Sequence, residues 1–196
     1  MKQALIILSV SIMLMTACSS NNTPKTQYYL LNSPTLKNSV VVNNLNNPRV
    51  AITLLELPDY LKQPSLVLQL SDHQLHYSHF HMWADPLQSS IIESLTQDLN
   101  TKNNPHNYNV TLSSSAESEV IIKITGFHST HQSQVILAGN YWLHGKNKRA
   151  SEKIHHFNLA IALDTDGYPH AVAQMRNLIT QLAHEINKSL TNVNSG

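Results

Sequence analysis

Cysteine is nearly absent from this chain of 196 residues, in which Cys18 is the only one. A disulfide bond within the chain is therefore excluded, and the fold has to be stabilised by its core. Glycine is also scarce, and five residues leave little room for a glycine-rich phosphate-binding loop. The chain lacks a Gly-x-Ser-x-Gly elbow and a His-Glu-x-x-His zinc motif, because His184-Glu185 has no second histidine after it. The sequence therefore predicts no catalytic residues, no cofactor and no enzyme.

Charged residues are sparse, at 13% of the chain, with 13 basic and 12 acidic side chains. Cleavage of residues 1–17 would remove only Lys2, which leaves twelve basic residues against twelve acidic ones and a net charge of zero. This balance excludes a strong electrostatic attraction to nucleic acid or to anionic lipid. One basic cluster is typical of a solvated turn that discourages aggregation, although it could also contact lipid headgroups or an acidic partner. Its members are Lys146, Lys148, Arg149 and Lys153.

The first seventeen residues are typical of an export signal. Lys2 supplies one positive charge, and an apolar run follows from Ala4 to Met15. The small residues Thr16 and Ala17 end the run and suit a cleavage site. Because the run is shorter than the ~20 residues that a membrane-spanning helix needs, we expect residues 1–17 to be a signal peptide that is removed.

Cys18 directly follows this signal. The sequence Met15-Thr16-Ala17-Cys18 resembles the bacterial lipobox, in which the cysteine thiol receives a diacylglyceryl group and becomes the first residue after cleavage. Several acyl chains hold a protein stably on a bilayer. Aspartate at the next position resembles an inner-membrane retention signal, so Ser19 indicates the periplasmic side of the outer membrane of a Gram-negative bacterium. The alternative is a plain secretory signal with a chance cysteine.

The mature chain is expected to consist of a tether and one domain. Residues 18–27 form the lipidated N-terminus and a polar tether, which could reach roughly 30 Å when extended. Residues 28–196 are sufficient for a single domain with one core.

Strands are predicted at residues 28–31, 40–42, 49–57, 66–70, 74–82 and 108–112. Segment 49–57 is apolar on both faces, so we expect a central strand covered by helices on each side of the sheet. Three later strands alternate with a period of two. Their apolar faces are Val120, Ile122 and Ile124; Val135, Leu137, Tyr141 and Leu143; and Phe157, Leu159, Ile161 and Leu163.

Two helices are predicted. The first begins at Asp85-Pro86-Leu87-Gln88, with Asp85 as the N-cap, Pro86 at the first helical position and Gln88 completing a capping box, and it ends near Thr101. The last follows a turn at Asp166-Gly167 and begins near Pro169. Their apolar stripes are Leu87, Ile91, Leu95 and Leu99, and Val172, Met175, Ile179, Leu182, Ile186 and Leu190. The element order predicts a single α/β layered domain, a mixed β-sheet with helices packed on it.

Histidine is abundant, with twelve residues, and four are crowded between His73 and His81. On a regular strand His79 and His81 would share a face and could hold a metal ion, while His76 would point to the other face. A third ligand is not evident, so no metal site is predicted. A histidine-rich, metal-binding periplasmic lipoprotein is nevertheless the alternative function.

Three segments together carry a family resemblance. Tyr28-Tyr29-Leu30-Leu31 follows the tether, Leu57-Pro58-Asp59-Tyr60-Leu61 with Gln63-Pro64 closes the central strand, and Trp83-Ala84-Asp85-Pro86-Leu87 opens the first helix. In this order, behind a lipobox, they resemble the ABC-type transport auxiliary lipoproteins of the PqiC-type group. The resemblance covers most of residues 28–100 and thins afterwards. It implies a mixed sheet with packed helices, related to anticodon-binding-like domains.

The resemblance also implies a role. Members of this family are outer-membrane lipoproteins that work with an MCE-domain membrane protein and an inner-membrane component to move lipids between the two membranes and to maintain envelope integrity. The chain would be a non-catalytic docking partner, attached to outer-membrane lipid by its acyl anchor. A homo-oligomer would suit docking around a tubular partner.

The loop after the central strand is the candidate contact for that partner. A rigid loop with Tyr60 and Leu61 exposed would make an anchor, whereas the same two side chains could instead cover the end of the sheet. The candidate residues are Pro58, Asp59, Tyr60, Leu61, Gln63 and Pro64.

Overall fold

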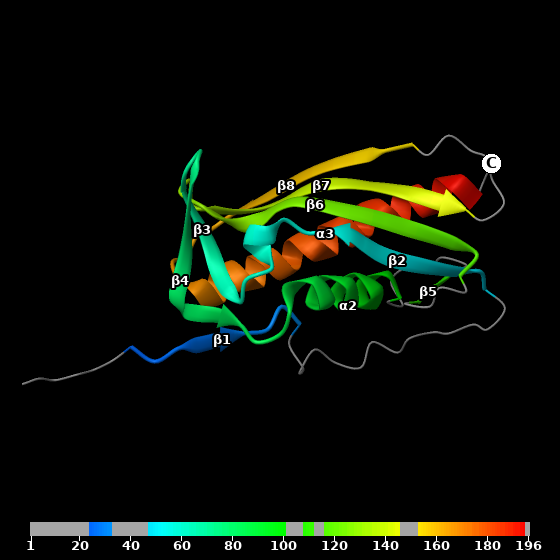
Figure 1. Cartoon of the computed structure of the whole chain (residues 1–196). Coiled ribbons are helices and arrows are strands. Elements are labelled where there is room, and N and C mark those ends of the chain that lie inside the picture. Colours follow the sequence, from blue (N-terminus) through cyan, green and yellow to red (C-terminus); the bar gives the residue numbers. More distant parts are fainter. Residues whose placement is uncertain (1–23, 33–46, 101–107, 112–115, 146–152, 195–196) are drawn as a thin grey trace, which may run out of the picture.

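The computed structural model describes residues 24–32, 47–100, 108–111, 116–145 and 153–194. The leader with Cys18, the strand predicted at 40–42, Leu112 and most of the basic cluster lie outside these residues. Figure 1 shows a sheet lying over two helices, with β1 at the end from which the predicted tether leaves.

Eight strands of the described residues form one mixed sheet, in the order β1-β4-β3-β6-β2-β5, and β7 and β8 extend it from the other edge of β6. The strands are β1 (Gln27–Tyr29), β2 (Arg49–Glu56), β3 (Ser65–Ser71), β4 (Gln74–Trp83), β5 (Asn109–Thr111), β6 (Ser118–Thr130), β7 (Gln134–Gly145) and β8 (His155–Ala162). The predicted strands within the described residues are confirmed, with ends shifted by a few positions.

Strand β6 is the centre of this sheet. One edge of β6 pairs in parallel first with β2 and then with β3, while the other edge pairs antiparallel with β7 along its whole length. The segment that connects β2 to β3 therefore lies between two stretches of chain that pair with the same edge of β6. The short 3-10 helix η2 (Asp59–Leu61) forms part of this connection.

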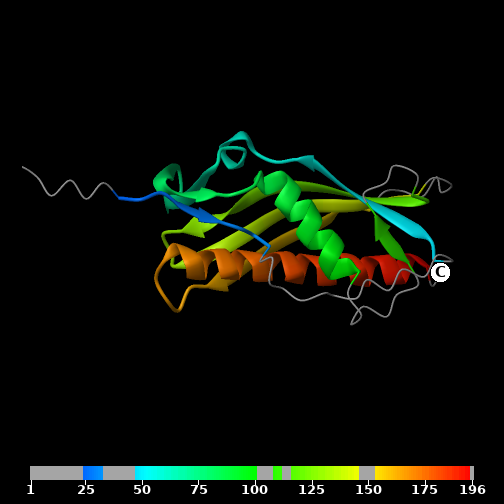
Figure 2. The same cartoon turned by 90° about the horizontal axis from the view of Figure 1, so that it is seen from below.

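Both helices cover the same face of the sheet. Helix α2 (Leu87–Leu99) and helix α3 (Tyr168–Asn194) pack against each other, and Figure 2 shows them side by side in front of the strands. The expectation of helices on each side is therefore wrong. The sequence of β2 misled because Ala51 is buried although it belongs to the second face, whereas Leu55 on that face is 60% exposed.

The predicted apolar faces lie on the helix side. Val120, Ile122, Ile124, Val135 and Leu137 are fully buried there. The two predicted helical stripes are buried as well, which confirms their periodicity of 3.6. Full burial of each such side chain contributes about 1.5–3 kcal/mol, so these stripes dominate the stability of the fold.

Helix α2 starts one residue later than predicted. Pro86 is the N-cap, with an extended ψ of 123°, and no side chain caps the helix, so the predicted roles of Asp85, Pro86 and Gln88 are wrong. The amide of Ala84 donates to the carbonyl of Tyr29 over 2.8 Å, which extends the β1–β4 ladder beyond the strand and delays the helix.

Helix α3 starts where the turn prediction placed it. Gly167 has a φ of 111°, a conformation that favours glycine, and its carbonyl accepts the amide of Ala171 over 3.1 Å. An ion pair joins the two helices farther along: Arg176 donates to both carboxylate oxygens of Asp98 over 2.7 and 2.6 Å. The hydroxyl of Thr180 donates to the same carboxylate over 2.9 Å.

Candidate functional site

The loop from Pro58 to Pro64 packs onto the sheet. Leu61 is only 3% exposed and Tyr60 is half-buried, so of the two alternatives the structure supports the one in which they cover the end of the sheet. Side chains three residues apart lie on the same side of a 3-10 helix, so Leu61 follows Pro58 towards the core. A partner contact through this loop stays a prediction and would use its exposed residues. These are Asp59, Lys62, Gln63 and Pro64.

Hydrogen bonds fix Tyr60 in place. Its hydroxyl lies 3.3 Å from the carbonyl oxygen of Thr125, to which it can donate, and 3.2 Å from Nδ1 of His128. The register of β6 shifts between Ile124 and Gly126, and a β-bulge of this kind leaves the ladder locally interrupted, so the Thr125 carbonyl is open to a side-chain donor.

Burial keeps this cluster neutral. The pKa of His128 is lowered by burial, and the pKa of Tyr60 is raised by burial and, to a lesser extent, by Tyr77. Nε2 of His128 lies 3.4 Å from Oε1 of Gln69. The neutral imidazole can therefore donate from Nε2 to Gln69 and accept the single hydroxyl proton of Tyr60 at Nδ1, in place of the Thr125 carbonyl, and this arrangement holds the loop.

The crowded histidines of β4 are not arranged as a regular strand would place them. The rings of His76 and His79 lie 6.3 Å apart, edge to face, so the expectation that they point in opposite directions is wrong. The pairing of β4 with β3 jumps from Tyr77 to Met82, and this irregularity breaks the alternation. His81 lies instead against Tyr29 and Tyr168. Across the described segments, no three histidine, cysteine or acidic side chains gather to hold a metal ion.

An aromatic cluster ties β1 to the rest of the domain. The hydroxyl of Tyr29 lies 2.7 Å from Nδ1 of His81. The ring of His81 stacks on Tyr168, with centroids 3.7 Å apart and an interplanar angle of 15°. Because Tyr168 begins α3 and His81 lies on β4, the cluster joins three elements at the end of the molecule that receives the tether.

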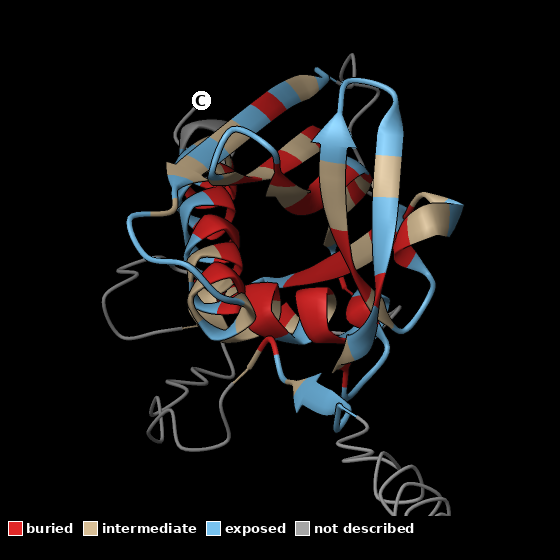
Figure 3. Ribbon diagram, turned by 90° about the vertical axis from the view of Figure 1, so that its left-hand side faces the viewer, coloured by how far each residue is buried: buried red, intermediate tan, exposed pale blue. Residues whose placement is uncertain are grey.

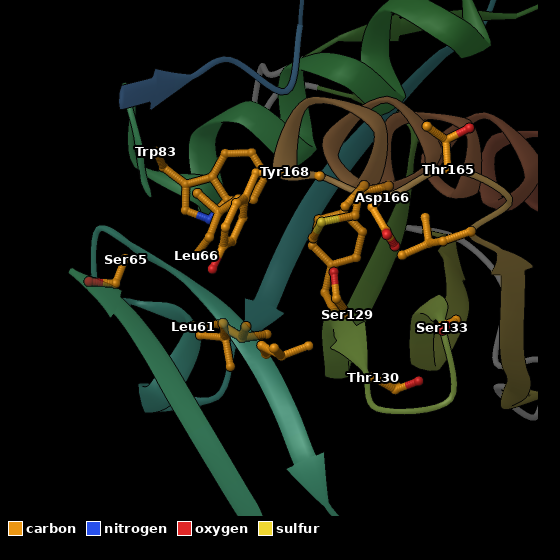
Figure 4. Close-up of a pocket in the computed structure, with 17 residues that line it drawn as sticks. Leu61, Ser65, Leu66, Trp83, Ser129, Thr130, Ser133, Thr165, Asp166 and Tyr168 are labelled. Carbon is orange, nitrogen blue, oxygen red and sulfur yellow. The ribbon is translucent and has the colours of Figure 1, made fainter. Parts of the chain in front are cut away.

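A pocket of about 270 Å³ lies beside this cluster. Its walls come from η2, β3, β4, β6, the β6–β7 turn, the β8–α3 loop and the first turns of α3. Figure 4 shows Trp83 and Tyr168 close together on one wall, with Leu61 and Leu66 below them. Figure 3 looks at this end of the molecule and shows the exposed β3–β4 hairpin next to it.

The same end carries most of the large apolar side chains that are exposed in the described residues. Tyr28 is 66% exposed, and four other side chains are 40–43% exposed. A monomeric protein rarely exposes such side chains together unless they contact a partner or a membrane. Those on β1, β3 and β4, or directly after β1, are Tyr28, Leu30, Leu70, Tyr77 and Phe80.

Sequence reasoning missed the pocket and the aromatic cluster. Of the pocket's lining, Trp83 was given no role, and Leu61 was predicted only as a candidate partner contact. The partners of Tyr29 and Trp83 are remote in sequence, so no local pattern could have brought them together. The described residues also contain no helix that is both long enough and apolar enough to cross a bilayer.

Comparisons with known proteins agree on one family. Residues 29–187 match the family described as the ABC-type transport auxiliary lipoprotein component. The intermembrane transport lipoprotein PqiC of Escherichia coli K12 is 23% identical over 181 residues, which are 92% of this chain and 94% of PqiC. PqiC of Shigella flexneri is similar to the same extent.

Two solved structures share the fold. A crystal structure of an uncharacterised protein has a TM-score of 0.70 at 22% identity and covers 85% of this chain and 99% of its own. A protein of Xanthomonas campestris has a TM-score of 0.61 at 14% identity, covering 83% and 90%. The family match runs from the last residue of β1 through α2 and the whole β6–β8 meander to residue 187 within α3, and the chain therefore belongs to the ABC-type transport auxiliary lipoprotein family.

Proposed function

We propose that this protein is a lipid-anchored, non-catalytic accessory component of an MCE-type intermembrane lipid transport system. It would be attached through Cys18 to the outer membrane, facing the periplasm, and would dock a periplasm-spanning MCE-domain protein and so contribute to envelope integrity. The family membership carries this proposal, because the family is one of transport auxiliary lipoproteins.

The geometry supports an anchored role. The described chain begins with exposed residues 24–28 and enters the fold as the edge strand β1. A chain that enters at an edge can run to a membrane without crossing the domain. An acyl anchor confines the domain to a thin layer at the bilayer, which raises its effective concentration for any partner that reaches that layer.

Two polar clusters of the described residues have structural roles, which is consistent with a binding role: Tyr60 with His128 holds η2, and Arg176 with Asp98 joins the helices. The polar groups of both clusters bind neighbouring side chains, and none of these four residues lines the pocket.

Mass spectrometry of the protein purified from its own membranes tests the anchor. We expect the mature chain to begin with a Cys18 that carries three acyl chains or a diacylglyceryl group, and we expect it in the outer-membrane fraction. A mature chain with a free thiol at Cys18, or one that fractionates as a soluble protein, would contradict the proposal.

A pull-down from crosslinked membranes tests the partner. We expect an MCE-domain protein to co-purify with the full lipoprotein. The charge-reversing change Lys62→Glu, combined with Gln63→Arg, alters only exposed side chains of the loop and should reduce that recovery. The matched control is Gln181→Arg on the exposed side of α3. Equal recovery with both variants would remove the loop from the docking surface, and recovery of no MCE protein at all would remove the proposed function.

A further inference from the structure

We propose that the pocket beside Trp83 binds a single acyl chain of a membrane lipid, so that the domain contacts lipid directly as well as docking a partner. The inference extends the proposed function, and it rests on the proposed anchor only for the orientation of the pocket towards the bilayer. The choice of an acyl chain as the ligand rests on the residues that line the pocket.

The deep walls of the pocket are hydrocarbon and aromatic. Leu61, Leu66, Trp83, Phe127 and Met175 line it, and each is at least nine-tenths buried within its own packing. The buried Thr130 is satisfied locally, because its hydroxyl accepts the amide of Gln132. In the described residues no lining side chain has a buried polar atom without a partner. Such a pocket offers little to a polar ligand and suits a hydrocarbon chain.

Polar residues stand at the mouth. Ser133, Thr165 and Asp166 are exposed and come from the β6–β7 turn and the β8–α3 loop, as Figure 4 shows for their positions along one side. Asp166 is the only charged side chain that lines the pocket within the described residues. A carboxylate at the mouth disfavours the carboxylate of a free fatty acid, so we infer that the preferred ligand has a zwitterionic headgroup.

The size fits one chain and no more. An apolar cavity of about 150 Å³ holds a molecule as large as benzene, so the pocket of about 270 Å³ has room for roughly ten carbons of a chain. A whole phospholipid with two chains would not fit.

The tether brings the pocket to the bilayer. Tyr29 of β1 pairs with Trp83, which is itself a wall of the pocket. Cys18 is eleven residues before Tyr29, so the proposed lipid anchor lies within roughly 36 Å of this wall. The exposed Tyr28 and Phe80 on the neighbouring strands are of the kind that favour the membrane–water interface. The exposed aromatic side chains of β1 and β4 and the apolar walls of the pocket thus lie at the same end of the domain.

The two tryptophans allow a direct test. Trp83 lines the pocket, whereas Trp142 lies on β7 and is not one of the residues that line the pocket. The probe is a lysophosphatidylcholine with a twelve-carbon chain that carries two bromine atoms, used below its micelle concentration with the mature chain bearing Cys18→Ser, which retains every described residue. We expect saturable quenching with one lipid per protein in Trp142→Phe, where Trp83 remains, and little quenching in Trp83→Phe, where Trp142 remains.

A chain-length series and two filling variants complete the test. For unbrominated lysophosphatidylcholines of eight to fourteen carbons, affinity should rise about fourfold per methylene and level off once the pocket is full. Ala171→Leu and Ser129→Leu each place a larger side chain in the pocket and should weaken binding about tenfold or more. Their melting temperatures should not fall if the cavity is filled without strain.

Three outcomes would overturn the inference. They are equal quenching of Trp83 and Trp142, affinity that is unchanged in both filling variants although they remain folded, and twelve-carbon fatty acid binding more tightly than the zwitterionic lipid. Since no partner protein is present, these results are independent of the MCE pull-down, and either proposal can fail without the other.

Discussion

The sheet has two ends that differ in how they are packed. At one end β2, β6 and β7 lie flat over the helices, and the side chains that face the helices are buried to the last few per cent. At the other end only two residue pairs join β3 to β6, the pairing of β4 with β3 is irregular, and a pocket and exposed aromatic side chains occur. The comparison teaches that the covered end supplies the stability while the end that receives the tether is available for contacts.

If this division is correct, changes at the covered end should affect stability far more than changes at the tether end. The predictions below run from the largest expected effect to the smallest.

Gly139→Ala should be the most damaging change. A Cβ at this position would lie 2.1 Å from the carbonyl oxygen of Lys123 and 2.8 Å from the ring of Phe157, so the β6–β7 pair would have to separate. We expect a loss of about 3 kcal/mol in the free energy of unfolding, measured by urea denaturation. The control is Gly145→Ala on the same strand, where a Cβ meets nothing within 4 Å. Equal stabilities for the two variants would contradict the tight packing of this end.

Arg176→Ala should cost somewhat less, about 2 kcal/mol, because it leaves the carboxylate of Asp98 without its main partner in a largely buried place. Adding Asp98→Asn removes the unpaired charge and should recover part of that loss. A double variant less stable than Arg176→Ala alone would show that the charge is not the cause.

Tyr60→Phe should lower the free energy of unfolding by about 1 kcal/mol, since it removes the hydroxyl that contacts Thr125 and His128. Tyr28→Phe, at an exposed position of the tether end, is the matched control and should change stability little. If the stability of Tyr60→Phe equals that of the wild type, the Tyr60 hydroxyl does not hold the loop, and Tyr60 would again be a candidate partner contact.

The smallest effect is a pH dependence at His128. Burial lowers the pKa of His128 in the folded state below its ordinary value of about 6.5. The unfolded chain therefore takes up the proton first, so this contribution to stability is complete above about pH 6.5 and is lost as the pH falls through the folded-state pKa. Denaturation curves between pH 7.5 and pH 5 should decline less steeply for His128→Asn than for the wild type. Parallel curves would show that His128 ionises freely in the fold.

Where the backbone is regular, the sequence was sufficient to predict which side chains are buried. The stripe Leu87, Ile91, Leu95 and Leu99 and the alternation of Val120, Ile122 and Ile124 predicted buried faces that are confirmed, because burial of one face follows directly from the period of the element. The position of both helices on one face was not predictable from β2, since an apolar second face there reflects Ala51 packing within the sheet rather than a second layer.

Where the backbone is irregular, local patterns failed. The histidines of β4 could not be placed because the jump from Tyr77 to Met82 depends on how β4 meets both β3 and β1. For Leu61 the sequence left two alternatives open, exposure or covering the end of the sheet, and it is the 3-10 helix η2 in the structure that buries the side chain. The pocket joins residues from both halves of the chain, and only the tertiary structure brings them together.

The brevity of β1 has a mechanical consequence. Three residue pairs hold it to β4, whereas Leu31, two residues after the strand, is buried. A force from the bilayer would therefore detach residues 27–30 from the sheet before it reaches the buried Leu31. This would lengthen the N-terminal connection to the membrane by roughly 13 Å without disturbing the core. With the proposed acyl anchor at Cys18, this extra length would let the domain follow a partner that moves relative to the membrane.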